Sequence, residues 1–342
     1  MTKTGWTPLA LLLLLAPGCA PAPTVENATL SVSEEVDFEA HIAEASAAYG
    51  EAQSFDEKLS VFRGFLEVHG VNETVAGFLH DVAWDATKAD RADDADALIN
   101  DVVAATDDPK LQLKAEAARI GLYARDDRAE ELAALAARLE NNHELRFFER
   151  YELMNAADET GAWELMLDQA EKSKALANAA AFKADYPKFS DADAARKGET
   201  RIAYVNAFKG WALANLGRTE EAYATFEAAL PHTHFNVLGV DDTPLHRFWG
   251  RTLLLDGRAE EAMEKLAVEA IYSPKKEALE AYKEAYSACH EDGSGFHEHL
   301  LDVRRRHGKS LDDFTLANYE GEPVSTSSFQ GDVLLLAFWF PT

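Results

Sequence analysis

The chain has 342 residues, of which 47% are hydrophobic, and this length suits about two globular domains. It carries 60 acidic and 33 basic residues, which gives a formal net charge of −27. So large a negative charge repels polyanions and therefore excludes nucleic acid and anionic lipid surfaces as general partners.

The first 18 residues have the pattern of a signal peptide. Lys3 precedes the apolar run 9–16, which is too short to span a bilayer and has the proportions of a secretory signal. Ala16-Pro17-Gly18-Cys19 resembles the cleavage box of bacterial lipoproteins, and the resemblance implies a lipid on Cys19. We therefore expect an exported protein of the periplasm or cell envelope, anchored to a membrane through Cys19 and a tether of residues 19–32. The alternative is an ordinary secretory peptide in which Cys19 has no role.

Residues 33–308 are rich in Ala, Leu, Glu and Asp and show helical periodicity, which predicts an all-α domain. Ser54-Phe55-Asp56-Glu57 is a capping box at the start of one helix, and Ser273-Pro274 has the cap and first residue of another. Gly217 and Gly257 stand where helices should end.

Part of this region repeats itself. Eight residues recur in the same order forty residues later: Gly210, Leu213, Gly217, Arg218, Glu220, Glu221, Ala222 and Phe226 match Gly250, Leu253, Gly257, Arg258, Glu260, Glu261, Ala262 and Leu266. Weaker copies of the turn occur at Asp90-Arg91-Ala92 and Asp127-Arg128-Ala129. The pattern resembles the tetratricopeptide helix-turn-helix repeat, and the resemblance implies an α-solenoid whose concave face binds a protein or peptide. A bundle of amphipathic helices without true repeats is the alternative.

The remaining chemical groups of the helical region point to packing rather than to a site. Cys289, His290, His297 and His299 have a spacing that matches no standard zinc site, so we expect a polar loop and no metal or cofactor. The basic run 304–307 suits the end of the last helix, where cations are favourable. Four tryptophans at helical positions are expected in the core: Trp84, Trp163, Trp211 and Trp249.

The composition changes near residue 309. Asp313-Phe314-Thr315-Leu316 predicts a short strand, residues 318–321 a turn, and Glu322-Pro323-Val324 a returning strand. The run 333–340 is apolar on both alternating faces, which predicts a central strand buried on both sides.

These segments resemble, in order, the opening of the redoxin group of thioredoxin-fold proteins, and most closely the membrane-tethered, TlpA-like thiol-disulfide oxidoreductases. In that pattern the strand ends Phe-Trp, and three residues lead to the first cysteine of Cys-x-x-Cys. Phe338 and Trp339 match the pair, and Phe340, Pro341 and Thr342 match the three residues. The resemblance implies that residues 309–342 begin a thioredoxin-like α/β domain. The catalytic cysteines would follow Thr342, so we expect no catalytic residue within this sequence.

The same resemblance implies that the full-length parent exchanges thiols and disulfides with a redox partner protein, through a mixed disulfide. Two other functions stay open at this point. A single cysteine further along would instead favour a peroxiredoxin, which reduces peroxide. The absence of a cysteine at either place would favour a non-enzymatic scaffold in which the helical array does the binding.

Overall fold

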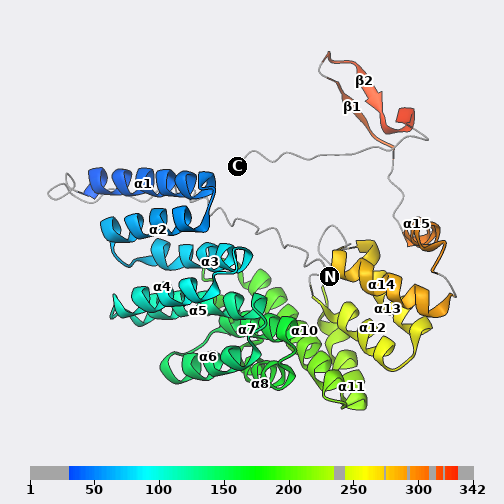
Figure 1. The fold of residues 1–342 in the computed structure, drawn as a ribbon. Coiled ribbons are helices and arrows are strands. Elements are labelled where there is room, and N and C mark those ends of the chain that lie inside the picture. The colour runs from blue at the N-terminus through cyan, green and yellow to red at the C-terminus, as the bar shows by residue number, and fades with distance from the viewer. Residues whose placement is uncertain are drawn as a thin grey trace. The chain divides into compact units, whose positions relative to one another are not determined.

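The computed structural model describes residues 31–234, 243–272, 275–290, 293–307, 313–318 and 320–329, with side chains from residue 38 onward. These ranges contain fifteen α-helices and one two-stranded antiparallel sheet (Figure 1). The predicted fold class, mostly helical with short strands near residue 320, is therefore confirmed. Among the described helices, none is long and apolar enough to cross a membrane.

The chain forms two compact units, Met1–Gly70 and Val71–Thr342. The first contains α1 (Ser31–Glu51) and α2 (Phe55–His69), which pack through the Phe38 ring against the rings of Phe65 and His69. The predicted capping box is confirmed at the start of α2. There the Glu57 amide donates to the Ser54 hydroxyl, and the Ser54 amide donates to the Glu57 carboxylate, both over 3.2 Å.

The second unit contains five helix pairs, each joined by a tight turn. They are α3 (Glu73–Lys88) with α4 (Ala92–Ala104), α5 (Pro109–Arg125) with α6 (Ala129–Asn142), α7 (Phe147–Thr160) with α8 (Trp163–Ser173), α10 (Asp191–Asn215) with α11 (Thr219–Ala229), and α12 (Leu245–Leu255) with α13 (Ala259–Tyr272). The two helices of every pair contact each other. The described part of the unit also holds α14 (Lys276–Cys289), α15 (Phe296–His307) and α9 (Ala179–Asp185).

One turn geometry recurs in all five pairs. A residue one or two positions after the first helix has a left-handed backbone, with φ between 58° and 76°: Asp90, Asp127, Gly161, Gly217 and Gly257. The next residue donates its amide to the carbonyl five positions back over 2.8–2.9 Å, which satisfies a carbonyl that the helix end would leave unpaired. Asp tolerates this backbone better than most residues with a side chain, so it replaces Gly in the first two pairs.

The two helices of each pair meet where a small residue faces a large one. A Cβ on Gly210 would lie 2.4 Å from the Phe226 ring, and one on Gly250 would lie 2.4 Å from Cγ of Leu266. Equally placed residues in the other pairs are also small on one helix and larger on its partner: Ala83 with Ile99, Ile120 with Ala136, and Met154 with Ala170. Each of these six is at most 2% exposed. The two facing side chains therefore keep a similar combined volume in every pair, and the larger of the two can come from either helix.

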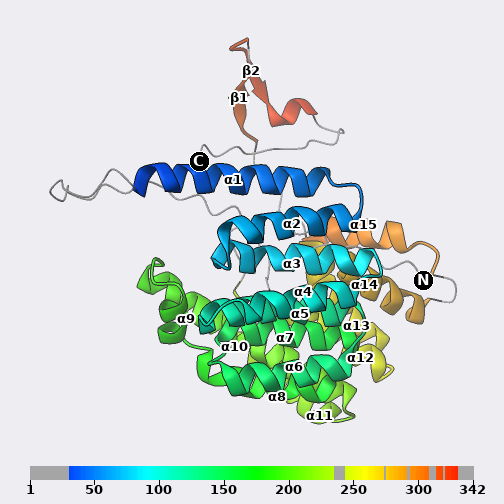
Figure 2. The ribbon, with the colours of Figure 1, turned by 60° about the vertical axis from the view of Figure 1, so that its left-hand side comes forward.

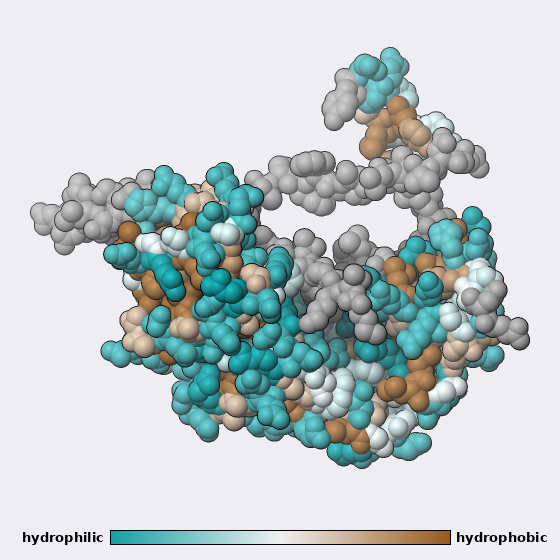
Figure 3. Space-filling model, in the orientation of Figure 1, coloured by the Kyte–Doolittle hydropathy of each residue, from teal (hydrophilic) through white to brown (hydrophobic). Residues whose placement is uncertain are grey.

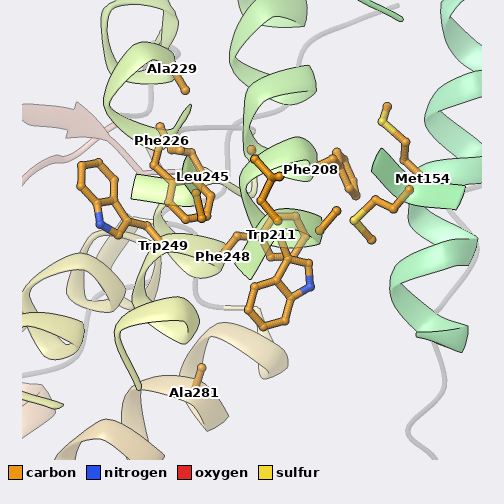
Figure 4. Close-up of a cluster of buried hydrophobic side chains, with 14 of the residues drawn as sticks. Met154, Phe208, Trp211, Phe226, Ala229, Leu245, Phe248, Trp249 and Ala281 are labelled. Carbon is orange, nitrogen blue, oxygen red and sulfur yellow. The ribbon is translucent and has the colours of Figure 1, made fainter. Parts of the chain in front are cut away.

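Aromatic rings fill the core between the fourth and fifth pairs (Figure 4). Trp211 stacks on Phe248 with ring centroids 5.5 Å apart, and Trp249 stacks on Phe226 at 5.8 Å. Trp211 and Trp249 are buried, as expected. Trp163 is half-buried but packs against this core, with its ring edge-on to Trp211 at a centroid distance of 5.9 Å. Trp84 is also only half-buried, and its placement in the core was wrong. For Trp84 the reason is that a cation, Arg125, covers its ring instead of apolar side chains.

A single inserted helix, α9, lies between the third and fourth pairs and packs on α10 (Figure 2). Arg201 of α10 holds it: the guanidinium donates to the Asp185 carboxylate over 2.7 Å and lies over the rings of Phe147 and Phe182. Gly198 permits the approach, because a Cβ there would be 2.4 Å from the Ala179 amide nitrogen.

The described strands are β1 (Thr315–Ala317) and β2 (Pro323–Ser325), paired so that Leu316 lies opposite Val324. Both predicted strands appear, the first beginning two residues later than predicted and the returning strand one residue later. A 3₁₀ turn, Thr326–Phe329, follows β2. The turn of the hairpin is closed by Asn318, whose side-chain oxygen accepts from the amides of Glu320 and Glu322, both over 2.9 Å.

Candidate functional site

The residues predicted to carry function at the two ends lie outside the described residues. They are the signal segment 1–18, Cys19, the strand 333–340, and the approach to the redox site at Phe338, Trp339, Phe340, Pro341 and Thr342. Ser273-Pro274 also lies outside them. The hairpin is the part of the predicted redox domain that can be described.

Asp313 organises that hairpin. Its carboxylate accepts from the hydroxyls of Ser325 and Thr326 at 2.6 and 2.7 Å, and from the Ser327 amide at 3.0 Å. These bonds lower the pKa of Asp313 to about 2, led by the Ser325 and Thr326 hydroxyls. The carboxylate thus ties the chain entering β1 to the chain leaving β2.

The Cys/His segment forms an aromatic cluster. His299 and the Tyr282 hydroxyl are hydrogen-bonded over 2.7 Å, and His290 stacks on Tyr286 with ring centroids 4.0 Å apart. Burial lowers the pKa of His299, and the charge of Arg306 adds to this. No group of three His, Cys, Asp or Glu side chains in the described ranges is arranged to hold a metal ion.

A row of charged and aromatic side chains lies on the first helices of the pairs, and sequence reasoning missed it. We call it the first-helix row; it comprises His80, Trp84, Lys114, Arg125, Tyr151, Glu152, Asp158, Glu159, Tyr204, Trp211, Arg247 and Arg251. The helices that carry it are continuous in space, because α3 contacts α5, α5 contacts α7 and α10 contacts α12. The α7–α10 step is made by Tyr151, whose ring meets Tyr204 edge-on at 5.3 Å.

The α3–α5 end of the row is cationic. Lys114 and Arg125 lie eleven residues apart on α5, close to three turns and therefore on one face. Arg125 lies over Trp84, 4.2 Å from the ring centroid, and donates to the Gly121 carbonyl over 3.2 Å. Gly121 makes room for it, since a Cβ there would be 2.9 Å from the guanidinium.

His80 faces the same charges. Its pKa is lowered to about 4, first by burial and then by the charges of Lys114 and Arg125. The imidazole is therefore neutral at pH 7, and adding a proton there would place a third cation in the group. The charges of Lys114 and Arg125 therefore contribute to the low pKa, although desolvation is its larger cause.

The α7 part of the row is anionic. Glu152 and Glu159 are seven residues apart, two turns along one face of α7. Burial raises the pKa of both carboxyls, and Arg125 opposes that rise in each. Burial also lowers the pKa of Arg125, while Glu159 and Glu152 act in the other direction. One guanidinium thus faces two carboxylates across the α5–α7 contact.

The α10–α12 end is aromatic and cationic. The Trp211 indole N–H donates to the Asp158 carboxylate over 2.6 Å. The guanidinium of Arg251 lies over the Trp211 ring, 4.6 Å from its centroid. This chain of contacts joins α7, α10 and α12. Arg247 lies one helical turn from Arg251 and stacks on Phe248 at 5.2 Å.

The positions of the row follow from the turns. His80, Tyr151 and Arg247 each stand ten residues before the left-handed residue of their pair. Trp84, Gly121, Trp211 and Arg251 stand six before it, and Arg125 and Glu159 two before it. An alignment of all five turns would identify the row from sequence, whereas the strong repeat covers only the turns at Gly217 and Gly257.

Figure 3 shows hydrophilic residues over much of the face that it draws, with hydrophobic patches between them. No protein-family model matches this chain, and no curated protein shows significant similarity to it.

Proposed function

We propose that this chain contains the helical, partner-binding region and the first strands of an exported thiol-disulfide oxidoreductase of the TlpA-like redoxin type. In this proposal a lipid on Cys19 attaches the protein to the membrane. The reacting thiolate belongs to a Cys-x-x-Cys that follows Thr342, and it exchanges electrons with a partner protein through a mixed disulfide.

The hairpin carries the redox part of the proposal. Its strands coincide with the segments that resemble redoxins, residues 313–316 and 321–325, and a 3₁₀ turn leads on toward the apolar run 333–340. The physical requirement is a rigid strand that presents a cysteine at a helix N-terminus, where the helix dipole and free amides lower the thiol pKa. The Asp313 bonds support this reading because they hold the two strands of the hairpin together at Ser325 and Ser327.

The first test is to read the coding DNA beyond the codon for Thr342 and to assay the resulting protein. We expect Cys-x-x-Cys in the next codons, and we expect the full-length protein to accelerate reduction of insulin disulfides by dithiothreitol. Replacement of the first of these cysteines by Ser should abolish that activity. A single cysteine with peroxide consumption would replace the proposal by a peroxiredoxin, and no cysteine would leave only the helical array.

The recurrent turn and the small-large contacts favour a second role, that of a tetratricopeptide-like binding array. Five pairs with one turn geometry support repeats rather than an irregular bundle. The first-helix row supplies the polar and aromatic groups that such an array would use to bind protein partners. Replacing Arg125 and Arg251 by Gln together should weaken capture of a redox partner without changing insulin reduction, which needs no docking on the array.

A further inference from the structure

The first-helix row changes sign twice along its length. Lys114 and Arg125 make the α3–α5 end positive, Glu152 and Glu159 make α7 negative, and Arg247 and Arg251 make α12 positive. These side chains are half-buried or exposed, so the alternation is presented to a ligand. A surface of this kind selects its partner by order of charge and not by net charge.

We propose that the row binds an extended segment of a partner protein that carries an acidic, then a basic, then a second acidic side chain. The basic residue lies between Glu152 and Glu159, and the acidic residues lie at Arg125 with Lys114 and at Arg247 with Arg251. This inference deepens the partner-binding role proposed above and does not depend on the redox chemistry.

The α7 carboxylates are the groups most in need of a ligand cation. Glu152 is half-buried and Glu159 is exposed. Desolvation raises the pKa of both carboxyls, and among the described residues Arg125 is the cation that opposes the rise in each. Asp158 adds a further negative charge beside Glu159. A Lys or Arg side chain placed here would offset the excess negative charge and pair with partly desolvated carboxylates.

The two cationic ends restrict the ligand further. Arg125 is already held by Trp84 and by its own helix, and Arg251 by Trp211, so their positions are fixed before binding. A segment with several basic residues in a row would bring like charges to Lys114 and Arg247. The row therefore discriminates against polybasic segments and accepts one basic residue with acids on both sides.

The helices set the spacing of these charges. Packed helices are about 8–10 Å apart, and an extended chain advances about 3.3 Å per residue, so one helix step corresponds to roughly three residues. The α5–α7 distance is one step, and α7 to α12, by way of α10, is two. The first acid should thus precede the basic residue by about three positions, and the second should follow it by about six.

Three fluorescein-labelled peptides of a neutral Ser/Ala background test this order by fluorescence anisotropy with the intact chain. The first has Glu, Arg and Glu at the spacing given above, the second has Arg, Glu and Arg, and the third has the charges of the first in the order Arg, Glu, Glu. We expect the first to bind at least about tenfold more tightly than either of the others, the ratio expected for about 1.4 kcal/mol of charge pairing. Equal affinities, or no binding of any peptide at millimolar concentration, overturn the proposal.

Variants locate the effect. Glu152→Gln with Glu159→Gln should weaken binding of the first peptide, because its Arg loses both carboxylate partners. Glu159→Lys should weaken it further, because a cation then faces that Arg. The matched control is Glu164→Gln, an exposed carboxylate on α8 of the same pair, which should change nothing. Unchanged affinity of the double Gln variant for the first peptide overturns the assignment. Because the peptides contain no cysteine, these outcomes are independent of whether the parent protein has redox activity.

Discussion

Gly210→Ala should destabilise the second unit although alanine is the better helix former. The added Cβ would lie 2.4, 2.7 and 2.9 Å from three ring carbons of Phe226, which is fully buried and has no room to move. Overpacking of this kind costs about 1–3 kcal/mol, and the gain in helix propensity returns about 1 kcal/mol. The difference is about 0–2 kcal/mol, and contacts as short as 2.4 Å place the expected loss in the free energy of unfolding at the upper end, about 2 kcal/mol.

Urea denaturation followed by circular dichroism measures this loss, with an unchanged dependence on urea concentration as evidence that only stability has changed. The control is Gly77→Ala in α3 of the same unit. Its nearest atoms, 3.3 Å away, belong to the mobile end of Lys114, so the variant should be neutral or up to about 1 kcal/mol more stable.

The double variant Gly210→Ala with Phe226→Ile reproduces the pairing of Ala83 with Ile99. It should be at least about 1 kcal/mol more stable than the sum of its two single changes, because the smaller side chain makes room for the new methyl group. If Gly210→Ala is as harmless as Gly77→Ala, or if the two changes are additive, small-large pairing does not determine how these helices pack.

Four further measurements test other contacts. Arg201→Met leaves the Asp185 carboxylate without its partner and should lower the free energy of unfolding by about 3 kcal/mol. Adding Asp185→Asn should recover part of this loss. A loss below about 1 kcal/mol for Arg201→Met would argue against this contact. The pKa of Glu152 is raised in the folded chain, so its protonated form favours folding at low pH, and this contribution is lost as the pH rises through the folded pKa. The variant Glu152→Gln should therefore be more stable than the unmodified chain at pH 7 and equally stable at pH 4. Glu140 acts in the opposite sense, because its hydrogen bonds to Lys172 and Arg150 lower its pKa to about 2. Its contribution to stability is present above the unfolded pKa and is lost as the pH falls through the folded pKa. The variant Glu140→Gln should therefore be less stable than the unmodified chain at pH 7, and this difference should disappear below pH 3. The Asp313 carboxyl should titrate near pH 2 by NMR, and Asp313→Asn should weaken protection of the Ser327 amide; an ordinary titration near pH 4 would contradict the described bonds.

Local signals in the sequence predicted the elements that local physics determines. The capping box at Ser54 and the hairpin turn at Asn318 depend on residues two to four positions apart, and both are formed. The left-handed turns at Gly217 and Gly257 were also expected, since glycine has no steric penalty there.

Non-local contacts account for what the sequence left out. The α9 insertion depends on Arg201 reaching a carboxylate sixteen residues away and on Gly198 allowing a close backbone approach. The first-helix row depends on neighbouring pairs, because the pKa of Glu152 is set by its burial and by Arg125 on another helix. The residue pattern within one helix does not indicate which side chains of a neighbouring helix will face it.

The first three pairs show why a repeat can be weak at the level of single residues and kept at the level of structure: the turns at Asp90 and Asp127 gave only weak sequence matches, and the turn at Gly161 gave none. Close packing constrains the combined volume of two facing side chains, so Gly with Phe and Ile with Ala both satisfy it. A pattern that requires the small residue on the first helix finds Gly210 and Gly250 and rejects Ile120. The turn relaxes in the same way, since Asp127 adopts the backbone that Gly257 adopts. What is repeated is therefore the contact between a small and a large side chain, together with the positive φ of the turn residue. A sequence search that considers the two facing positions together would recover all five helix pairs.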